Sequence, residues 1–507
     1  MSNPLYDTLF GIHAGSTKPF LLLKDGTHWT YDAYLQKTAQ IAHVLNDHGL
    51  RPGDRLAAQV QKSPEALALY AACVQAGIVF LPLNTAYTAD ELTYFIENSG
   101  ASMVVCDAAK EAQLSPIAKR LGATLNTLNA DGTGTLTDAA RDKPTKFDTV
   151  ARNKDDLAAF LYTSGTTGRS KGAMLTQDNL LSNALVLVDY WRFTEDDVLL
   201  HALPIFHTHG LFVATNVILA VGGSMIFLPA FDIDIMIDRM GEATTMMGVP
   251  TFYTRLLGDD RFDRDLVAHM RLFVSGSAPL LAETHIQFEK RTGHRILERY
   301  GMTETNMSTS NPYDGDRRAG TVGFPLPGVE LKITDPETGK TIPDGEVGQI
   351  EVRGPNVFKG YWQMPEKTAA ELRRDGFFIT GDLGKVDEDG YVHIVGRNKD
   401  LIISGGYNIY PKEIELVLDE QPGILESAVI GVPHADFGET VLAILVPEPG
   451  ATPNLEAIAE AASATLARFK QPRKMIVIDE LPRNTMGKVQ KNILRDQYSD
   501  TFAPAEG

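Results

Sequence analysis

Helical patterns and short apolar strands alternate along the chain between Thr30 and Pro279. The stretch TYDAYLQKTAQIAHVLNDHGL has apolar residues at helical spacing, and the following DRLAAQV has the pattern of a strand. A Ser-Pro pair at Ser63 and a capping box at Thr88 open two further helices. The alternation continues through SMIFLP, TTMMGV and MRLFVSGSAP. It predicts doubly wound, mostly parallel sheets covered by helices, with ligands bound at the carboxyl ends of the strands.

The pattern changes at about Val322, where strands become short and rich in turn residues. GVELKITDPETGKTIP, GQIEVRG and GYVHIVG predict a small antiparallel subdomain, and a compact mixture of helices and strands follows Gly396. A chain of 507 residues also exceeds what one hydrophobic core usually supports. We therefore expect an α/β fold with a large N-terminal domain over residues 1–396 and a small, mobile α+β C-terminal domain over residues 397–507.

Composition excludes several classes of protein. Lys and Arg number 47 against 65 Asp and Glu, so the net charge of −18 disfavours binding to nucleic acid or to anionic membranes. Cys73 and Cys106 lie in apolar runs, which predicts buried thiols rather than a disulfide framework or zinc site and fits the cytoplasm. No signal peptide is expected at the N-terminus. The uncharged residues 211–231 are interrupted by Gly and Pro, so we expect no membrane span there.

The stretch TSGTTGRSKG, residues 163–172, has the composition of a phosphate-binding loop. It combines five hydroxyl side chains and three glycines with Arg169 and Lys171. Glycine lets the backbone approach a ligand closely, while hydroxyls, N–H groups and a lysine can surround phosphate oxygens. It is not a Walker A loop, because Gly172 follows Lys171 where that motif needs Ser or Thr. A surface loop would have a similar composition.

Two further motifs carry carboxylates. YGMTET, residues 300–305, follows the helix-like QFEKRTGHRILERY and offers an aromatic ring, two hydroxyls and Glu304. FFITGDLG places Asp382 after a strand pattern, where it could accept both hydroxyls of a ribose or serve as an ordinary turn aspartate.

Two later motifs carry basic residues. GRNKD contains Arg397 and Lys399 at the expected domain boundary, where a solvated linker would also explain the charges. LPRNTMGKVQK places Lys488 on a Gly-containing turn, and a lone lysine there is usually a surface residue.

Together and in this order, TSGTTGRSKG, YGMTET, TGD, GRNKD and PRNTMGK resemble the adenylate-forming superfamily of acyl-CoA synthetases, peptide-synthetase adenylation domains and firefly luciferase. The resemblance covers nearly the whole chain. It implies that ATP with Mg²⁺ activates a carboxylate as an acyl-adenylate, and that CoA then accepts the acyl group. It also implies that the C-terminal domain rotates about a hinge at Lys399 between the two half-reactions.

The resemblance implies roles for individual residues. Lys488, Glu304 and His207 would be catalytic, with Lys488 bridging the carboxylate and the α-phosphate. Thr166 and Glu304 would place Mg²⁺. CoA would pass Gly405, Gly406 and Tyr407. Tyr300 would stack on adenine, while Asp382 and Arg397 would hold the ribose. The implied ATP-binding residues are Thr163, Ser164, Gly165, Thr166, Thr167, Gly168, Lys171, Ser277, Tyr300, Gly301, Thr303, Asp382 and Arg397.

The acyl pocket implied by this resemblance contains two cations, Arg255 and Arg299. An arginine in a dry pocket needs an anionic partner, which a second carboxylate on the substrate would supply. HALPIFHTHGLF, VPTFYTRLL, RLFVSGSAPLL and the region around YGMTET are similar to malonyl-CoA synthetases, which make malonyl-CoA and methylmalonyl-CoA. In this scheme Ser277 also holds the distal carboxylate, while His207 and Met302 limit the depth of the pocket.

Several alternatives remain at the level of sequence. Arg255 could be exposed on a helix, and Arg299 could pair internally with Glu298 or Asp316. The enzyme could activate another small carboxylate or load a carrier protein. A nucleotide-binding regulatory protein without turnover is disfavoured by the presence of Lys488 together with the other motif residues. Acetylation of Lys488, which would remove its charge, is a further hypothesis.

Overall fold

The structure is a computed structural model that describes residues 2–163, 170–404, 407–434, 437–484 and 487–502. The chain forms two compact units. Unit 1 comprises residues 1–319, 323–330 and 352–378, and unit 2 comprises residues 320–322, 331–351 and 379–507. The predicted α/β fold class is confirmed, while the predicted domain boundary at residue 396 stays a prediction.

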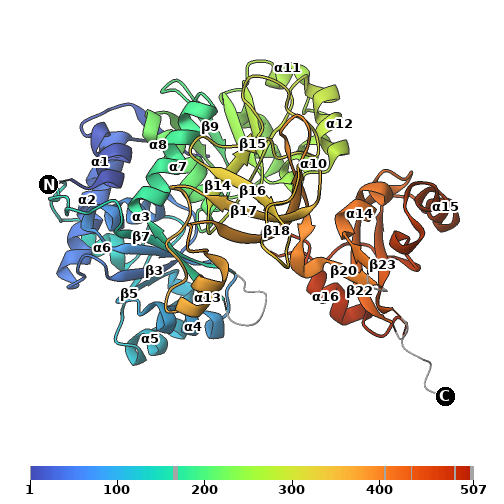
Figure 1. The fold of residues 1–507 in the computed structure, drawn as a ribbon. Coiled ribbons are helices and arrows are strands. Elements are labelled where there is room, and N and C mark those ends of the chain that lie inside the picture. The colour runs from blue at the N-terminus through green and yellow to red at the C-terminus, as the bar shows by residue number, and fades with distance from the viewer. Residues whose placement is uncertain (1, 164–169, 405–406, 435–436, 485–486, 503–507) are drawn as a thin grey trace. The chain divides into compact units, whose positions relative to one another are not determined.

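Unit 1 contains two large sheets. The order of the first is β6 (Thr124–Thr127), β5 (Met103–Cys106), β3 (Arg55–Gln59), β4 (Val79–Pro82), β7 (Leu157–Thr163) and β8 (Lys171–Thr176). Strands β6, β5, β3, β4 and β7 are parallel to one another, and β8 pairs antiparallel with β7. Figure 1 shows α2 and α3 on one side of this sheet and α4 and α5 on the other. The predicted layer arrangement is thus present.

The second sheet of unit 1 is parallel through its centre and antiparallel at both ends. Its order is β15 (Phe324–Pro325), β14 (Asn306–Ser310), β13 (Leu297–Met302), β12 (Leu272–Ser275), β11 (Thr245–Gly248), β9 (Val198–His201), β10 (Ser224–Phe227), β1 (Pro19–Leu22) and β2 (His28–Thr30). The expected strands SMIFLP, TTMMGV and MRLFVSGSAP are β10, β11 and β12. Successive loops therefore leave the carboxyl ends of neighbouring parallel strands on one edge.

Helices of unit 1 begin at caps that are visible in the sequence. Ser63 and Thr88 accept hydrogen bonds from the first turns of α3 and α4, and Thr176 does so for α7. The helices are α1 (Pro4–Leu9), η1 (Gly11–His13), α2 (Tyr31–Asp47), α3 (Pro64–Ala76), α4 (Ala89–Ser99), α5 (Ala108–Arg120), α6 (Thr135–Ala140), α7 (Gln177–Tyr190), η2 (His209–Thr215), α8 (Asn216–Val221), α9 (Ile233–Met240), α10 (Pro250–Leu257), α11 (Arg264–Val267), α12 (Ala282–Thr292) and α13 (Pro365–Glu371).

One local prediction in unit 1 is wrong. QFEKRTGHRILERY is helical only as far as Thr292, because Gly293 adopts φ of +80° and ends α12. The apolar residues that follow join the parallel sheet as β13. Tertiary pairing thus overrides the apparent helical pattern.

Most residues of a small sheet belong to unit 2, and the sequence predicts antiparallel strands there. Its order is β16 (Glu330–Thr334), β17 (Gly348–Arg353), β18 (Phe378–Val386) and β19 (Val392–Arg397). A second sheet, mostly antiparallel, packs against helices around a core that includes Ile409, Ile414 and Val429. The other elements are η3 (Asn398–Asp400), β20 (Ile402–Ser404), β21 (Tyr407–Ile409), α14 (Pro411–Asp419), β22 (Ile424–His434), β23 (Gly438–Pro447), α15 (Leu455–Thr465), η4 (Arg468–Lys470), β24 (Lys474–Val477) and α16 (Lys491–Tyr498).

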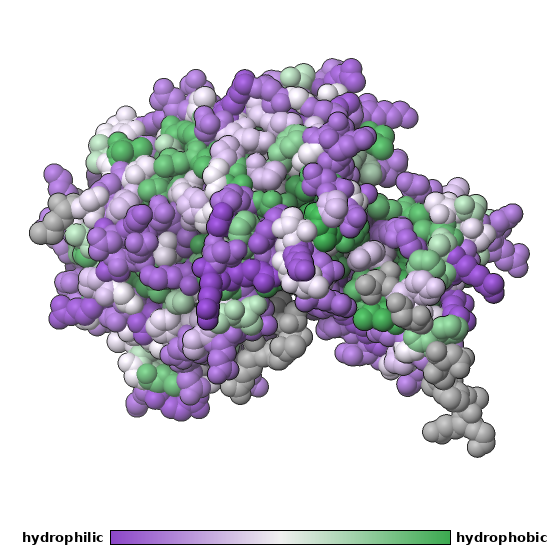
Figure 2. All heavy atoms as spheres, in the orientation of Figure 1, coloured by the Kyte–Doolittle hydropathy of each residue, from purple (hydrophilic) through white to green (hydrophobic). Residues whose placement is uncertain are grey.

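The burial of side chains agrees with the composition. Most side chains on the face drawn in Figure 2 are hydrophilic, and Cys73 and Cys106 are buried free thiols, as predicted. Residues 211–231 divide into η2, α8 and β10 rather than one long helix. Among the described residues, none of the helices combines the length and apolar character needed to cross a bilayer.

Candidate functional site

The residues that flank the predicted phosphate loop form the end of a hairpin. Thr163, the last residue of β7, pairs with Lys171, the first residue of β8. The predicted residues Ser164, Gly165, Thr166, Thr167 and Gly168 lie outside the described residues. Thr163 Oγ1 donates to Glu304 Oε1 at 3.3 Å, so the phosphate motif and the YGMTET motif meet at this point.

YGMTET comprises the end of β13 and the tight turn into β14. A Cβ atom on Gly301 would lie 1.8 Å from the carbonyl oxygen of Asn306, so only glycine fits there. Asn306 itself adopts a positive φ of 48°, which Asn tolerates better than most residues. The turn buries Glu304, while Tyr300, Met302 and Thr303 are half-buried. Backbone packing at this hairpin therefore fixes the position of the Glu304 carboxylate.

Tyr361 and Glu371 lie next to Glu304 in a hydrogen-bonded chain, and the sequence analysis did not identify either. The Tyr361 hydroxyl lies 3.0 Å from Glu304 Oε1 and 2.7 Å from Glu371 Oε2. Glu371 also forms an ion pair with Lys171. We call Thr163, Lys171, Glu304, Tyr361 and Glu371 the Glu371 cluster.

Arg299 is a buried cation on β13. Its side chain is 3% exposed, and burial lowers its pKa to about 9, an effect that Tyr253 and Glu298 partly offset. Within the described chain, its Nε and Nη2 atoms have no hydrogen-bond partner. Any internal salt bridge would therefore leave at least these two nitrogen atoms unsatisfied. Alternation along β13 places Arg299 and Tyr300 on opposite faces of the strand.

Glycine at position 276 makes room for this guanidinium. A Cβ atom on Gly276 would lie 2.4 Å from Arg299 Cζ. The next residue, Ser277, adopts a positive φ of 73°, which is uncommon for a residue other than glycine and recurs at functional sites. The loop after β12 is thus shaped around the arginine head group.

His209 completes this region and was missed by the sequence analysis, which singled out His207 in the same segment. His209 Nδ1 lies 3.2 Å from Ser277 Oγ, and the side chain is 3% exposed. Burial and the neighbouring Arg299 hold the pKa of His209 well below its usual value, so the imidazole is neutral. Its Nε2 atom has no partner among the described residues. We call Arg299, Ser277 and His209 the Arg299 group.

A buried lysine supports the segment that carries His209. Lys62 Nζ donates to Nδ1 and to the carbonyl oxygen of His201, both at 2.8 Å, and lies 4.4 Å from the ring centroid of Phe227. His201 Nε2 lies 2.9 Å from the carbonyl oxygen of Gly210, the second residue of η2. No sign of this contact between Lys62 and His201 was present in the sequence, because a single lysine after a strand is common at protein surfaces.

The predicted role of Arg255 in the acyl pocket stays a prediction. Arg255 is exposed on α10, and its guanidinium lies 5.6 Å from the ring centroid of Phe231. It lies in the last turn of an amphipathic helix, where a positive charge interacts favourably with the helix dipole. The exposed-helix alternative therefore describes this residue, and any contact with substrate stays a prediction.

His207 is half-buried in unit 1, and unit 2 carries the other predicted residues. Arg397 Nε lies 2.6 Å from Asp382 Oδ1, and the two residues are partners across β18 and β19. Lys399 is exposed in η3. Tyr407 is exposed and stacks on Phe469 at 4.7 Å between ring centroids. Gly405 and Gly406 lie outside the described residues.

Lys488 is exposed at the end of a short turn in unit 2. Its backbone N–H donates to the side chain of Asn484 at 3.0 Å, and its carbonyl oxygen accepts from the Asn484 backbone at 2.9 Å. The side chain of Asn484 therefore fixes the backbone that presents Lys488. The catalytic role of the lysine stays a prediction.

Comparison with known proteins identifies the family. The model for AMP-binding enzymes matches residues 13–362, and that for the AMP-binding enzyme C-terminal domain matches residues 413–488. A malonate–CoA ligase from Arabidopsis thaliana is 36% identical over 480 residues, which cover 88% of this chain and 78% of the relative.

Solved structures agree with this assignment. The crystal structure of ATP-bound MatB from Rhodopseudomonas palustris has a TM-score of 0.97 and 60% identity, covering 99% of this chain and 100% of that chain. A benzoate CoA ligase from Burkholderia xenovorans LB400 has a TM-score of 0.88 and 26% identity, covering 97% and 99%. The chain therefore belongs to the AMP-binding enzymes, the adenylate-forming family that its ordered motifs predict.

Proposed function

We propose that the chain is an AMP-forming acyl-CoA ligase that converts malonate, ATP and CoA into malonyl-CoA, AMP and pyrophosphate. The observation that carries the substrate assignment is the Arg299 guanidinium, which is buried and has two nitrogen atoms without hydrogen-bond partners among the described residues. A buried cation in this state is costly, and a carboxylate that binds it would remove the cost.

The position of Arg299 favours a second carboxylate over the reacting one. Arg299 and Tyr300 point to opposite faces of β13, and Tyr300 is the residue proposed to stack on adenine. The carboxylate that attacks ATP must lie against the α-phosphate, on the nucleotide side. A diacid such as malonate can place one carboxylate there and the other at Arg299, where Ser277 and neutral His209 offer further polar contacts.

The proposed chemistry has two steps. In the first, a malonate oxygen attacks the α-phosphorus in line, the bond to the β-phosphate oxygen breaks, and pyrophosphate leaves. Lys171 holds the outer phosphates, and Lys488 offsets charge between the carboxylate and the α-phosphate. In the second, the CoA sulfur attacks the acyl carbon, the thiol proton passes to solvent, and AMP leaves. Rotation about Lys399 between the steps is part of the proposal.

Glu304 fits the predicted role in placing Mg²⁺. Its carboxylate is buried and lies within 3.3 Å of the hydroxyl oxygens of Thr163 and Tyr361, and oxygen atoms are the ligands that this ion prefers. The ion supplies positive charge to the phosphates when bound. Glu304, for its part, holds a negative charge at a fixed place at the end of the phosphate hairpin.

The second substrate, the rival assignments and the location are further parts of this proposal. Methylmalonate keeps both carboxylates and adds one methyl group, so we expect it as a second substrate. The relatives include an enzyme named for an aryl acid, the benzoate CoA ligase, so the rival assignment is a CoA ligase for a monocarboxylate. Transfer to a carrier protein is a rival for the second step. The cytoplasmic location stays a prediction.

A substrate panel tests the assignment. Malonate, methylmalonate, succinate, acetate and benzoate would each be incubated with ATP, Mg²⁺ and CoA, and AMP formation would be measured. We expect the highest kcat/KM for malonate, then methylmalonate. Equal or faster turnover of acetate or benzoate would overturn the diacid assignment, and turnover only with a carrier protein would overturn CoA as the acceptor.

A further inference from the structure

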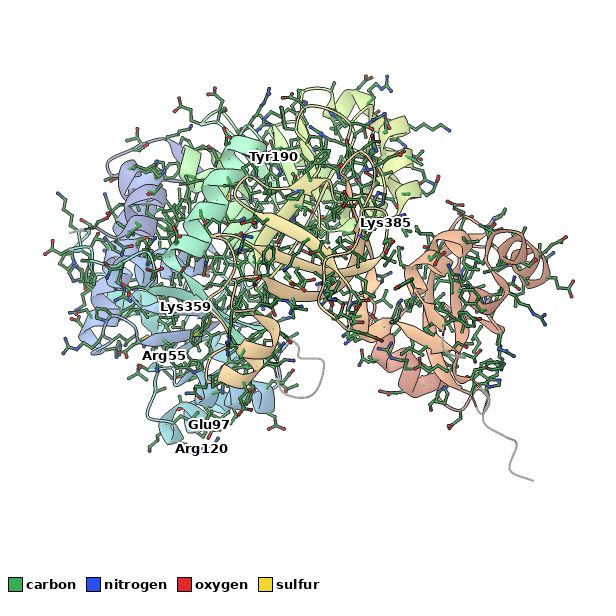
Figure 3. All side chains as sticks on the ribbon, in the orientation of Figure 1. Arg55, Glu97, Arg120, Tyr190, Lys359 and Lys385 are labelled. Carbon is green, nitrogen blue, oxygen red and sulfur yellow. The ribbon has the colours of Figure 1, made fainter. Side chains whose placement is uncertain are left out.

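A backbone segment after β17 brings Tyr361 to the start of β8. Met174 N donates to the carbonyl oxygen of Gly360 at 3.0 Å, and Trp362 N donates to that of Gly172 at 2.8 Å. Figure 3 labels Lys359, the first residue of this segment, whose N–H donates to the Met174 carbonyl oxygen at 3.0 Å. The segment therefore lies along β8 and places Tyr361 beside Lys171. Helix α13 follows, and Glu371 is its last residue.

Glu371 receives hydrogen bonds from three side chains. Lys171 Nζ lies 3.4 and 3.3 Å from its two oxygen atoms, and Lys367 Nζ lies 2.7 Å from Oε1. The Tyr361 hydroxyl lies 2.7 Å from Oε2, and the Lys171 ammonium also lies 4.2 Å from the ring centroid of Tyr361. The carboxylate and the aromatic ring thus hold Lys171 from two sides, although lysine is a flexible point charge by itself.

The Tyr361 hydroxyl touches two carboxylates but carries one proton. The hydroxyl can therefore donate to only one of the two carboxylates at a time. The shorter contact is to Glu371, at 2.7 Å, and the contact to Glu304 is 3.0 Å. When the proton lies toward Glu371, the one hydrogen bond that Glu304 Oε1 keeps from the described side chains is the longer one from Thr163, at 3.3 Å. Its remaining lone pairs are then available to a cation.

We propose that Glu371 is a positioning residue of the nucleotide site, which fixes Lys171 directly and orients Glu304 through Tyr361. This inference rests on the proposed roles of Lys171 toward phosphate and of Glu304 toward Mg²⁺. Glu371 does not itself touch ATP in this account. The ammonium of Lys171 has three donors, so it can keep Glu371 and bind a phosphate oxygen at the same time.

Binding measurements with Glu371→Gln test this proposal without relying on turnover. The amide keeps the size and one acceptor but loses the charge that holds Lys171. We expect calorimetric titration to show ATP affinity reduced about tenfold, both with and without Mg²⁺, the scale of one weakened charge-assisted interaction. Glu366→Gln is the matched control, because Glu366 lies exposed on the same helix and loses the same charge. It should leave ATP affinity unchanged.

A second variant separates the effect of Glu371 on Lys171 from its effect on Glu304. Tyr361→Phe keeps the ring beside Lys171 but removes the hydroxyl between the two carboxylates. ATP affinity without Mg²⁺ should stay at the wild-type value, while the Mg²⁺ concentration needed for half-maximal ATP binding should rise about threefold or more. A role limited to folding would lower the melting temperature of both variants and would not produce this split.

Several outcomes would overturn the proposal. Wild-type ATP affinity in Glu371→Gln would exclude a positioning role, and tighter ATP binding would mean that Glu371 competes with phosphate for Lys171. If Glu371→Gln does not fold, an unchanged Mg²⁺ requirement in Tyr361→Phe still excludes the proposed orientation of Glu304 by Tyr361. None of these measurements includes an acid substrate, so a failed malonate assignment would appear in the substrate panel instead.

Discussion

The Arg299 group and the Glu371 cluster differ in whether their charged side chains have partners within the described chain. In the Glu371 cluster, Lys171 and Glu371 pair with each other, and Tyr361 connects Glu371 to Glu304. In the Arg299 group, the guanidinium is more deeply buried, yet two of its nitrogen atoms lack partners in the described chain. Each charged side chain of the first region thus has a partner before any ligand binds. The second is complete only with an anion, which is why we place the distal carboxylate there.

Removing Lys171, the cation of the Glu371 cluster, should weaken the binding of ATP and leave the choice of acid substrate unchanged. Lys171→Ala should raise the KM for ATP about ten- to a hundredfold, because a hydrogen bond to a charged group contributes about 1.5–3 kcal/mol. The ratio of kcat/KM for malonate to that for propionate should stay near the wild-type ratio. Steady-state kinetics with each substrate varied in turn would measure both. A large change in that ratio would mean that the two regions are not separate.

A smaller change should disturb only the Arg299 group. Gly276→Ala adds a methyl group 2.4 Å from Arg299 Cζ, so the guanidinium must move. Overpacking of this kind costs about 1–3 kcal/mol, and we expect kcat/KM for malonate to fall on the order of tenfold. The KM for ATP should change less than kcat/KM for malonate, because the added methyl group meets the Arg299 guanidinium. Equal losses for malonate and propionate would indicate general damage to the loop.

Arg255 should give the smallest effect. It is exposed on α10, and surface substitutions usually change stability by less than about 0.5 kcal/mol. Arg255→Ala should therefore keep kcat/KM for malonate within about twofold of wild type in the same assay. A loss comparable with that expected for Arg299 would restore the arginine pair that the sequence suggested.

The sequence predicted much of the fold because its signals are local. Caps at Ser63 and Thr88 and the alternation of helix and strand patterns correspond to α3, α4 and the parallel sheets. The stretch before YGMTET was misread because pairing with β12, a long-range interaction, makes residues 297–302 a strand.

The site was predictable where a motif is contiguous and not where contacts join distant segments. Glu304 could be found from YGMTET, but its link to Glu371 depends on a backbone segment that joins β8 from far along the chain. His209 escaped notice because its significance comes from Ser277 across the fold. The two arginines look equivalent in the sequence, and only helix orientation and strand alternation separate exposed Arg255 from buried Arg299.

The measurement that tests the account most directly compares malonate with propionate in wild type and in Arg299→Met, which removes the charge and keeps an apolar chain. Losing one partner of a buried ion pair costs roughly 3–5 kcal/mol, so kcat/KM for malonate should fall by about two to three and a half decades. Propionate has no distal charge, and its kcat/KM should stay level or rise. Parallel losses for both acids, with an unchanged melting temperature, would contradict the claim that Arg299 binds a second carboxylate.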